Sequence, residues 1–183
     1  MAVGQILAVH VGRPTELQTG RKRVLSAINK QLVHGPVMVR RLNIDGDEQA
    51  DLSVHGGPDK ALYCYPAEHY EAWNAELELP ITYGFFGENL TVAGLAETDL
   101  HIGAVLLAGE AVLQVSQPRL PCFKLGMKFG SQHFVRQFLN SGRSGFYCRV
   151  LKEGLIESGQ TIEIVDRAEG NLTVSESLAS AIG

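Results

Sequence analysis

The feature that most constrains the fold is a series of short apolar runs, rich in valine, isoleucine and leucine, that glycines separate. The chain has 183 residues, with 20 glycines and only seven prolines. Runs at 3–11, 37–40, 61–65, 101–107, 111–116, 144–151 and 160–166 have the length and composition of β-strands. They do not alternate regularly with helices, which argues against a parallel βαβ fold. A mainly β protein is predicted, with a closed or partly closed β-barrel, since closure removes exposed strand edges.

Two segments show helical periodicity, and a third could begin near the end of the chain. Pro66 suits a first helical position, and Tyr70, Trp73 and Leu77 after it form one apolar face. Ser131 is predicted to cap a second helix, which stops near 140–142. We therefore expect two or three short helices, a barrel domain at 1–167 and a polar C-terminal tail at 168–183 that could begin a further helix at 174–178.

Charge and cysteine content exclude several classes of function. The net charge of −4 gives no electrostatic reason to expect nucleic acid or an anionic membrane as partner. No apolar run is long enough to span a bilayer, and the N-terminus lacks the pattern of a signal peptide. Three cysteines make no disulfide framework, and an odd number suits a reducing compartment. A cytoplasmic protein is predicted.

Cys122 is the strongest candidate for a chemical role. Pro121 precedes it, and Arg119 and Lys124 lie within three residues on either side. Nearby positive charge favours the thiolate, which is the form that acts as nucleophile or metal ligand. The predicted hairpin at 101–116 leads directly into this segment, so a rigid scaffold would present the thiol. The alternative is a buried thiol that only fills space, which is the common role of a lone cysteine.

A polar tract at 43–60 is the second candidate site. It holds His55, Gly56 and Gly57, where backbone amides could approach a ligand closely, followed by Lys60. Its acidic residues do not follow the spacing of a calcium loop, and which of Asp45, Asp47 and Asp51 face a site stays open. Asn89 follows a glycine-flanked aromatic turn and could bind a ligand or satisfy local backbone groups.

Two further observations limit the choices. Residues 21–23 form a small basic cluster, which is either a solvated turn or an arm that contacts an anion. The sequence lacks a P-loop, a dinucleotide-binding glycine fingerprint, a Cys-x-x-Cys pair and a His-Glu-x-x-His motif. What remains is one cysteine with basic neighbours and a polar tract, which together suit an anionic ligand.

These motifs together resemble the MOSC domain, the molybdenum cofactor sulfurase C-terminal type, in its YiiM-like bacterial branch. The resemblance covers roughly residues 3 to 167, with the motifs in the same order. It is carried by Asp45-Gly46-Asp47-x-Gln49-x-Asp51, His55-Gly56-Gly57-Pro58-Asp59-Lys60-Ala61, Tyr65-Pro66-x-x-His69-Tyr70-x-x-Trp73, Phe86-Gly87-Glu88-Asn89-Leu90 and Gln117-x-Arg119-x-Pro121-Cys122-x-Lys124-Leu125.

The resemblance implies a barrel fold and a molybdopterin-type molybdenum cofactor, with Cys122 as the metal ligand and catalytic residue. It implies reduction of N-hydroxylated compounds such as hydroxylamino-purines, with electrons from a separate reductase. A thiolate is a strong donor to a soft metal. Cationic and amide groups would hold the phosphate and the pterin. The residues expected to hold the cofactor are His55, Gly56, Gly57, Lys60, Asn89, Gln117, Arg119 and Lys124.

Two other functions fit the same residues. In one, Cys122 carries a persulfide and passes sulfur to a cofactor or metal centre. In the other, the domain stores or delivers the cofactor without turnover, since a fold does not by itself define a reaction. YiiM-like proteins usually continue into a small helical domain, whereas this chain ends at Gly183, about where the first helix of that domain would begin. The tail at 168–183 is thus interpreted as a remnant of that domain, in either a naturally shorter MOSC protein or a truncated chain.

Overall fold

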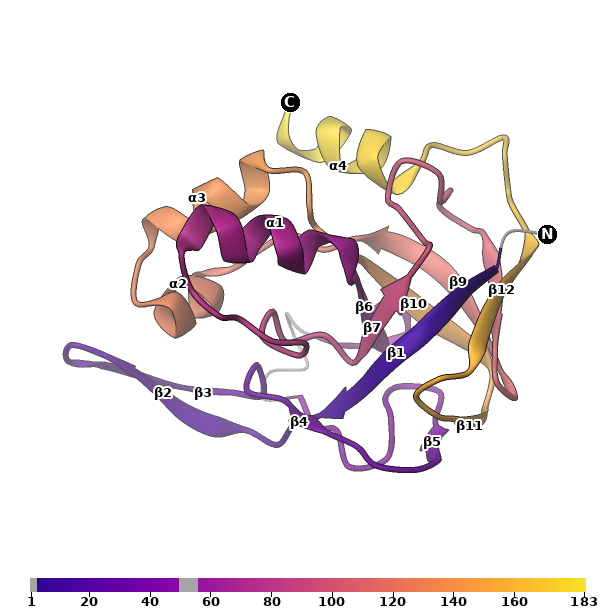
Figure 1. Cartoon of the computed structure of the whole chain (residues 1–183), viewed down its shortest axis with the longest axis horizontal. Helices are drawn as coiled ribbons and strands as arrows, with labels where there is room; N and C mark the ends of the chain where they lie inside the picture. Colours follow the sequence, from indigo (N-terminus) through magenta and orange to yellow (C-terminus); the bar gives the residue numbers. More distant parts are fainter. Residues whose placement is uncertain (1–2, 50–55) are drawn as a thin grey trace.

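The computed structural model describes residues 3–49 and 56–183. Seven strands close into a barrel, as predicted, with each strand hydrogen-bonded to the next and the last to the first (Figure 1). In order around the barrel they are β1 (Val3–Val11), β12 (Thr161–Asp166), β8 (Val105–Ala108), β9 (Ala111–Pro118), β10 (Phe146–Lys152), β6 (Leu62–Pro66) and β7 (Leu90–Ala93). All neighbours are antiparallel except β6 and β7, which are parallel.

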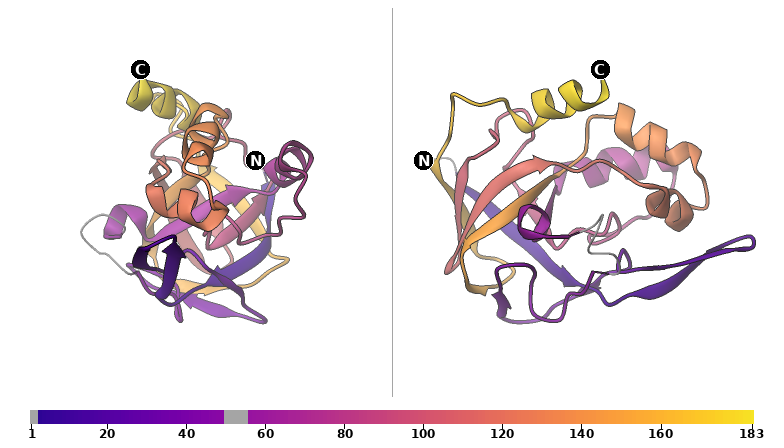
Figure 2. Two further views of the ribbon diagram at one scale, coloured as in Figure 1. Left: turned by 90° about the vertical axis from the view of Figure 1, so that its left-hand side faces the viewer. Right: turned by 180° about the vertical axis from the view of Figure 1, so that it is seen from behind.

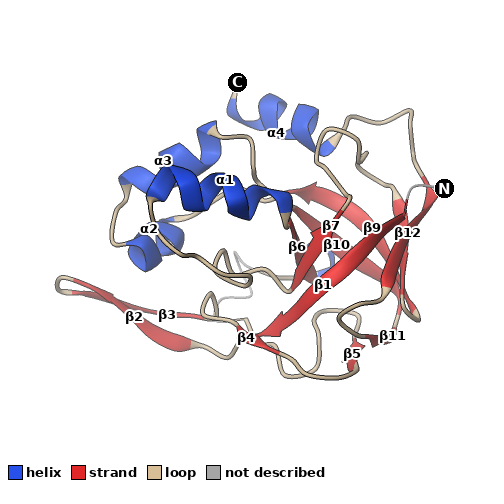
Figure 3. Cartoon of the chain, viewed as in Figure 1, coloured by secondary structure: helices blue, strands red, loops and turns tan. Residues whose placement is uncertain are grey.

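Shorter elements surround the barrel. They are the hairpin β2 (Thr15–Thr19) and β3 (Lys22–Ser26), β4 (Gln31–Leu32) on the edge of β1, the pair β5 (Val37–Val39) and β11 (Gly154–Ile156), and the 3-10 turn η1 (Pro58–Lys60). The helices are α1 (Glu68–Leu77), α2 (Phe123–Phe129), α3 (His133–Asn140) and α4 (Val174–Ile182). The described residues thus form four α-helices rather than two or three. Figure 3 shows α1, α2 and α3 gathered at one end of the barrel, where the β2–β3 hairpin also projects (Figure 2).

Strand β6 separates two apolar cores, because its alternate side chains point to opposite faces. Leu62 and Cys64 belong to the cluster that fills the barrel. Tyr63 and Tyr65 belong to a second, aromatic cluster, which α1, α2 and α3 complete. In this cluster the rings of Trp73 and Phe138 stack with 5.9 Å between their centroids. A strand that is apolar on both faces must be covered on both, and the helices provide the outer cover.

Three local predictions are wrong. Pro66 ends β6, where it pairs with Val92 of β7, and α1 begins two residues later. Ser131 does not cap α3, because Gln132 holds the N-cap position and makes no side-chain capping bond. The helix in the tail buries more than expected, since Val174 is completely buried and packs in the barrel cluster.

Helix α4 has a well-formed start. The Thr173 hydroxyl accepts a hydrogen bond from the Glu176 backbone amide, while the Glu176 carboxylate accepts one from the Thr173 amide. This reciprocal pair satisfies two amides that the first turn leaves without helical partners. None of the helices in the two described ranges is long and apolar enough to cross a membrane.

Candidate active site

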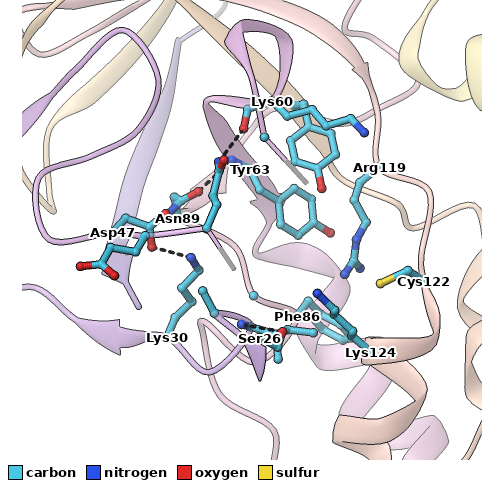
Figure 4. Close-up of a pocket in the computed structure, with 17 residues that line it drawn as sticks. Ser26, Lys30, Asp47, Lys60, Tyr63, Phe86, Asn89, Arg119, Cys122 and Lys124 are labelled. Carbon is cyan, nitrogen blue, oxygen red and sulfur yellow. Dashed lines mark hydrogen bonds and ion pairs between the residues drawn. The ribbon is translucent and has the colours of Figure 1, made fainter. Parts of the chain in front are cut away.

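A pocket opens between the barrel and the helical end of the molecule (Figure 4). It contains about 670 Å³ of empty space, part of which is open solvent. The lining comes from segments far apart in the sequence, namely the residues after β3, the tract before η1, the outer face of β6, the turn before β7 and the segment after β9.

Cys122 lies at the wall of this pocket, four residues after the end of β9. Its backbone is extended and it occupies the N-cap position of α2. The predicted hairpin of β8 and β9 leads into this segment as expected, although its first strand begins at Val105 rather than at residue 101. By contrast, Cys64 and Cys148 are completely buried in the barrel, in keeping with a packing role.

Arg119 is the most unusual side chain in the pocket, because only 6% of it is exposed. Its guanidinium carbon lies 5.0 Å from the ring centroid of Tyr63 and 5.2 Å from that of Phe138. Its Nη1 atom is buried without a hydrogen-bond partner. A buried donor without a partner is costly, so this atom is suited to bind an anion or an oxygen of a ligand.

The environment nevertheless keeps the Arg119 guanidinium charged. Burial disfavours the charge, but the nearby Tyr63, Tyr147 and Cys122 side chains outweigh it and raise the pKa of Arg119 above its ordinary value. Figure 4 shows the guanidinium and the Cys122 sulfur turned toward one another. A fixed positive charge beside a cysteine sulfur is the arrangement that generally favours a thiolate.

Tyr63 and Tyr147 form an aromatic wall of the pocket that sequence reasoning missed. Their ring centroids lie 5.3 Å apart, and the Lys60 ammonium lies 5.9 Å from the centroid of Tyr147. Burial raises the pKa of both phenols, so both stay protonated at neutral pH. A signal was present, because Tyr63 and Tyr147 alternate with inward-facing Cys64 and Cys148 along their strands.

Lys30 and Asp47 form a buried ion pair in the pocket wall, with 7% and 2% of their side chains exposed. Asp47 also accepts a hydrogen bond from the backbone amide of Gly12 at 2.8 Å. Asp45 does not line the pocket and pairs instead with Arg40 at the surface, which lowers the pKa of Asp45. Of the acidic residues in the tract, Asp47 therefore faces the pocket and Asp45 does not. Asp51 lies outside the described residues.

The turn before β7 is held against the neighbouring strands by hydrogen bonds from the Asn89 side chain. The side-chain oxygen of Asn89 accepts from the Tyr63 amide at 3.0 Å, and its nitrogen donates to the His10 carbonyl at 3.3 Å. Gly87 has φ +83°, and a Cβ there would lie 2.8 Å from the Ile28 side chain. Glycine is therefore needed for this close approach. Asn89 lines the pocket, but its side chain joins β6 to β1.

Glu88 does not line the pocket and is completely buried behind it. One carboxylate oxygen accepts hydrogen bonds from the Gly84 amide, the Thr91 hydroxyl and the Tyr70 hydroxyl. The Glu88 side chain therefore holds the turn together.

The structure brings most of the predicted site residues together. The lining of the pocket includes Gly56, Lys60, Asn89, Arg119, Cys122 and Lys124. Gly57 and Gln117 are not part of that lining, and Gln117 pairs with Tyr147 on neighbouring strands. His55 lies outside the described residues. Lys30, Tyr63, Phe86 and Tyr147 line the pocket without having been predicted.

Comparison with known sequences identifies the family. The MOSC domain matches residues 51–163, and the chain belongs to the MOSC domain family. It is similar to YflK of Bacillus subtilis (strain 168), with 46% identity over 169 residues that cover 92% of this chain and 76% of that protein. It is also similar to YiiM of Escherichia coli (strain K12), with 39% identity over 177 residues that cover 92% of this chain and 78% of that protein.

A longer relative and a solved structure complete the comparison. A protein of Gibberella moniliformis (strain M3125 / FGSC 7600) named "Reductase" is 38% identical over 168 residues, which are 90% of this chain but only 30% of that protein. The crystal structure of YiiM from Geobacillus stearothermophilus has a TM-score of 0.81 and 36% identity, over 97% of this chain and 83% of that one. The chain is therefore a YiiM-like MOSC protein.

Proposed function

We propose that this chain binds a molybdopterin-type molybdenum cofactor through Cys122 and reduces N-hydroxylated compounds. The observation that carries the proposal is the Cys122 sulfur turned toward the buried guanidinium of Arg119, whose Nη1 atom lacks a partner. A pocket built this way offers one soft ligand and one desolvated cation side by side. The family and the fungal relative named "Reductase" support this reading.

The residues of the pocket fit such a cofactor. A single thiolate is a suitable protein ligand for a metal whose other donors come from an organic group. Arg119 and Lys124 would hold the anionic part, because charge-assisted hydrogen bonds to phosphate are among the strongest in proteins. Tyr63 and Tyr147 give a flat aromatic wall against which a heteroaromatic ring can stack. When bound, the cofactor supplies the redox chemistry.

The proposed reaction breaks an N–O bond. A hydroxylamino compound takes up two electrons and two protons, the N–O bond breaks, and the products are an amine and one water molecule. The chain binds and orients the substrate and partly excludes water from the pocket. Lys60 and Lys124 line the pocket, and their side chains are able to donate hydrogen bonds to the leaving oxygen. The buried phenols keep their protons at neutral pH, and the Tyr63 hydroxyl donates a hydrogen bond to the Ser144 carbonyl at 2.7 Å.

The test is to purify the protein from cells that make the molybdenum cofactor. Molybdenum content is measured by mass spectrometry, and turnover of an N-hydroxylated purine is measured with reduced methyl viologen as electron donor. We expect about one molybdenum per chain and turnover in the natural sequence. Cys122→Ser is expected to lose both, because a neutral hydroxyl is a much poorer ligand than a thiolate.

Cys148→Ala is the matched control, since it removes a thiol buried in the barrel and should keep both metal and turnover. Metal that is bound without turnover would favour a protein that stores or delivers the cofactor. A chain without molybdenum that carries a cyanide-labile sulfur on Cys122 would instead establish the sulfur carrier. Either result would overturn the reductase proposal. A functional thiolate at Cys122 would favour a reducing compartment such as the cytoplasm, which preserves thiols.

A further inference from the structure

An exposed apolar spot lies in the same segment as Cys122, which lines the pocket. Leu120 is 52% exposed and Phe123 is 40% exposed, and both flank Cys122 in the sequence. The Lys22 ammonium, from the β2–β3 hairpin, lies 4.2 Å from the ring centroid of Phe123. Figures 1 and 2 place this hairpin and α2 at the same end of the molecule. We call Arg21, Lys22, Leu120 and Phe123 the mouth surface.

The mouth surface carries two exposed cations, Arg21 and Lys22, in a chain whose net charge is −4. The hairpin at 15–26 and the segment at 119–129 together contain six lysines and arginines but one carboxylate, Glu16. Their net charge is +5, of which the buried Arg119 and the largely buried Lys128 contribute two. Glu16 pairs with Arg23 at 3.5 Å on the exposed hairpin and leaves Arg21 and Lys22 uncompensated by it. A basic cluster attracts acidic proteins and speeds their association. An apolar spot beside it can then form the water-excluding core of the interface.

The hairpin is well placed to serve as one side of such a contact. Its inward-facing Leu17 is buried in the aromatic cluster, and its partner Val24 packs against the same cluster. These contacts hold a two-stranded hairpin that would be only marginally stable alone. Its turn, with Arg21 and Lys22, is exposed and free of that packing role. Charges there can change without loss of the core contacts.

We propose that the mouth surface docks a small acidic electron-transfer protein, one that carries a flavin or an iron–sulfur cluster. This inference rests on the proposed function, because the reduction consumes two electrons that a redox partner must bring. The partner contacts Leu120 and Phe123 with an apolar patch around its own redox group, while its carboxylates face Arg21 and Lys22. Its redox group then lies at the mouth of the pocket, beside the segment that holds Cys122.

The test uses the full chain loaded with cofactor and two probes, an acidic flavodoxin and an acidic plant-type ferredoxin. Dissociation constants are measured by titration calorimetry at low and at moderate salt, independently of turnover. Turnover of the N-hydroxylated purine is then compared with the better-binding protein and with methyl viologen as donors. The variant is Arg21→Glu/Lys22→Glu, and the matched control is Lys152→Glu/Arg167→Glu, which makes the same charge change at exposed positions of the barrel.

We expect the natural chain to bind at least one probe, with affinity that falls as salt rises. The mouth variant should weaken binding by about tenfold or more and lower protein-driven turnover equally, with viologen-driven turnover unchanged. The barrel control should stay within about twofold. The proposal is overturned if neither probe binds, if both variants weaken binding equally, or if the mouth variant abolishes self-association of the chain instead. If methyl viologen gives no turnover, the proposed function fails, while the binding measurement still decides the docking surface.

Discussion

Strands β6 and β10 each have one face toward the barrel interior and one toward the pocket, and the side chains on the two faces differ in kind. On the inner face, Cys64, Phe146 and Cys148 are completely buried in an apolar cluster that fills the barrel. On the outer face, Tyr63 and Tyr147 form the wall of a pocket that also contains a buried charge. The inner face is packed with apolar groups, whereas the outer face contains a buried charge that lowers stability.

The difference is visible in the polar atoms that burial leaves without partners. In the described residues these are His10 Nδ1, Glu88 Oε2, Arg119 Nη1 and Arg143 Nη1, and none belongs to the barrel cluster. Each such atom costs stability that well-packed apolar groups would not. The barrel interior holds the two thiols Cys64 and Cys148, and burial raises the pKa of Cys148 well above its usual range. The Cys148 thiol therefore stays protonated, whereas we propose a thiolate at Cys122.

The largest effect is expected from a cavity in the barrel. Leu106 is completely buried there, and Leu106→Ala should lower the free energy of unfolding by about 2 to 5 kcal/mol. Chemical denaturation measures this. The matched control is Leu107→Ala at the next position, where the side chain is 37% exposed and the change should stay below about 1 kcal/mol. Cofactor content per folded molecule should not change in either variant. Equal destabilisation by the two would refute the separation of faces.

Much of the barrel could be predicted from the sequence, because its strands are apolar, short and separated by glycines. The hairpin of β8 and β9 and the position of Cys122 after it follow from local patterns. Other elements could not be predicted. The strands β2 and β3 are mostly polar and are held by Leu17 and Val24, which contact residues distant in the sequence. Helix α2 follows Cys122 over only seven residues, too few for a clear period.

The site shows the same limit. Arg119 and Lys124 were found because they neighbour the cysteine in the sequence. Lys30 was not found, because its role depends on the ion pair with Asp47, 17 positions later. Asn89 was predicted as a cofactor-binding residue and does line the pocket. Its side chain, however, makes hydrogen bonds to the backbone of β6 and β1. Sequence spacing thus indicates which groups carry chemistry, and the fold decides which of them support the others.

A smaller effect on folding but a clear effect on binding is expected at Arg119. Arg119→Met removes a buried guanidinium whose Nη1 atom has no hydrogen-bond partner. The free energy of unfolding of the cofactor-free chain should therefore change by no more than about 1 kcal/mol in either direction. Cofactor retention should fall by about 10- to 100-fold, the value of one charge-assisted hydrogen bond. Molybdenum content after dialysis and chemical denaturation together measure both quantities.

Arg143→Met is the matched control for Arg119. Arg143 also has a buried Nη1 without a partner and also lies over an aromatic ring, 4.7 Å from the centroid of Trp73, but it is not part of the pocket lining. Its replacement should leave cofactor retention unchanged. If both variants lose the cofactor equally, the cause would be disturbed packing of the aromatic cluster. The prediction that Arg119 binds the cofactor directly would then be wrong.

The smallest effect is expected at Lys128 and appears as a change in pH dependence. The pKa of Lys128 is lowered to about 8, mainly by burial; the nearby Glu88 opposes this shift, whereas Arg119 and Lys30 add to it. The unfolded chain, with an ordinary lysine pKa of 10.5, therefore binds more protons than the folded one between about pH 8 and pH 10.5. The contribution of Lys128 to stability is thus unfavourable below pH 8 and improves as the pH rises through this window.

Lys128→Met removes the charge and keeps an apolar stem beside Phe85, over which the ammonium lies at 4.5 Å. The variant should gain about 1 kcal/mol relative to the natural chain at pH 7, and this gain should shrink as the pH rises to 9.5. Chemical denaturation at several pH values measures the difference between the two chains. The buried tyrosines titrate above this range in both chains, so their effect cancels in the difference. A difference that is the same at pH 7 and pH 9.5 would show that Lys128 is not desolvated, and its surroundings would then resemble the exposed surface more than the barrel interior.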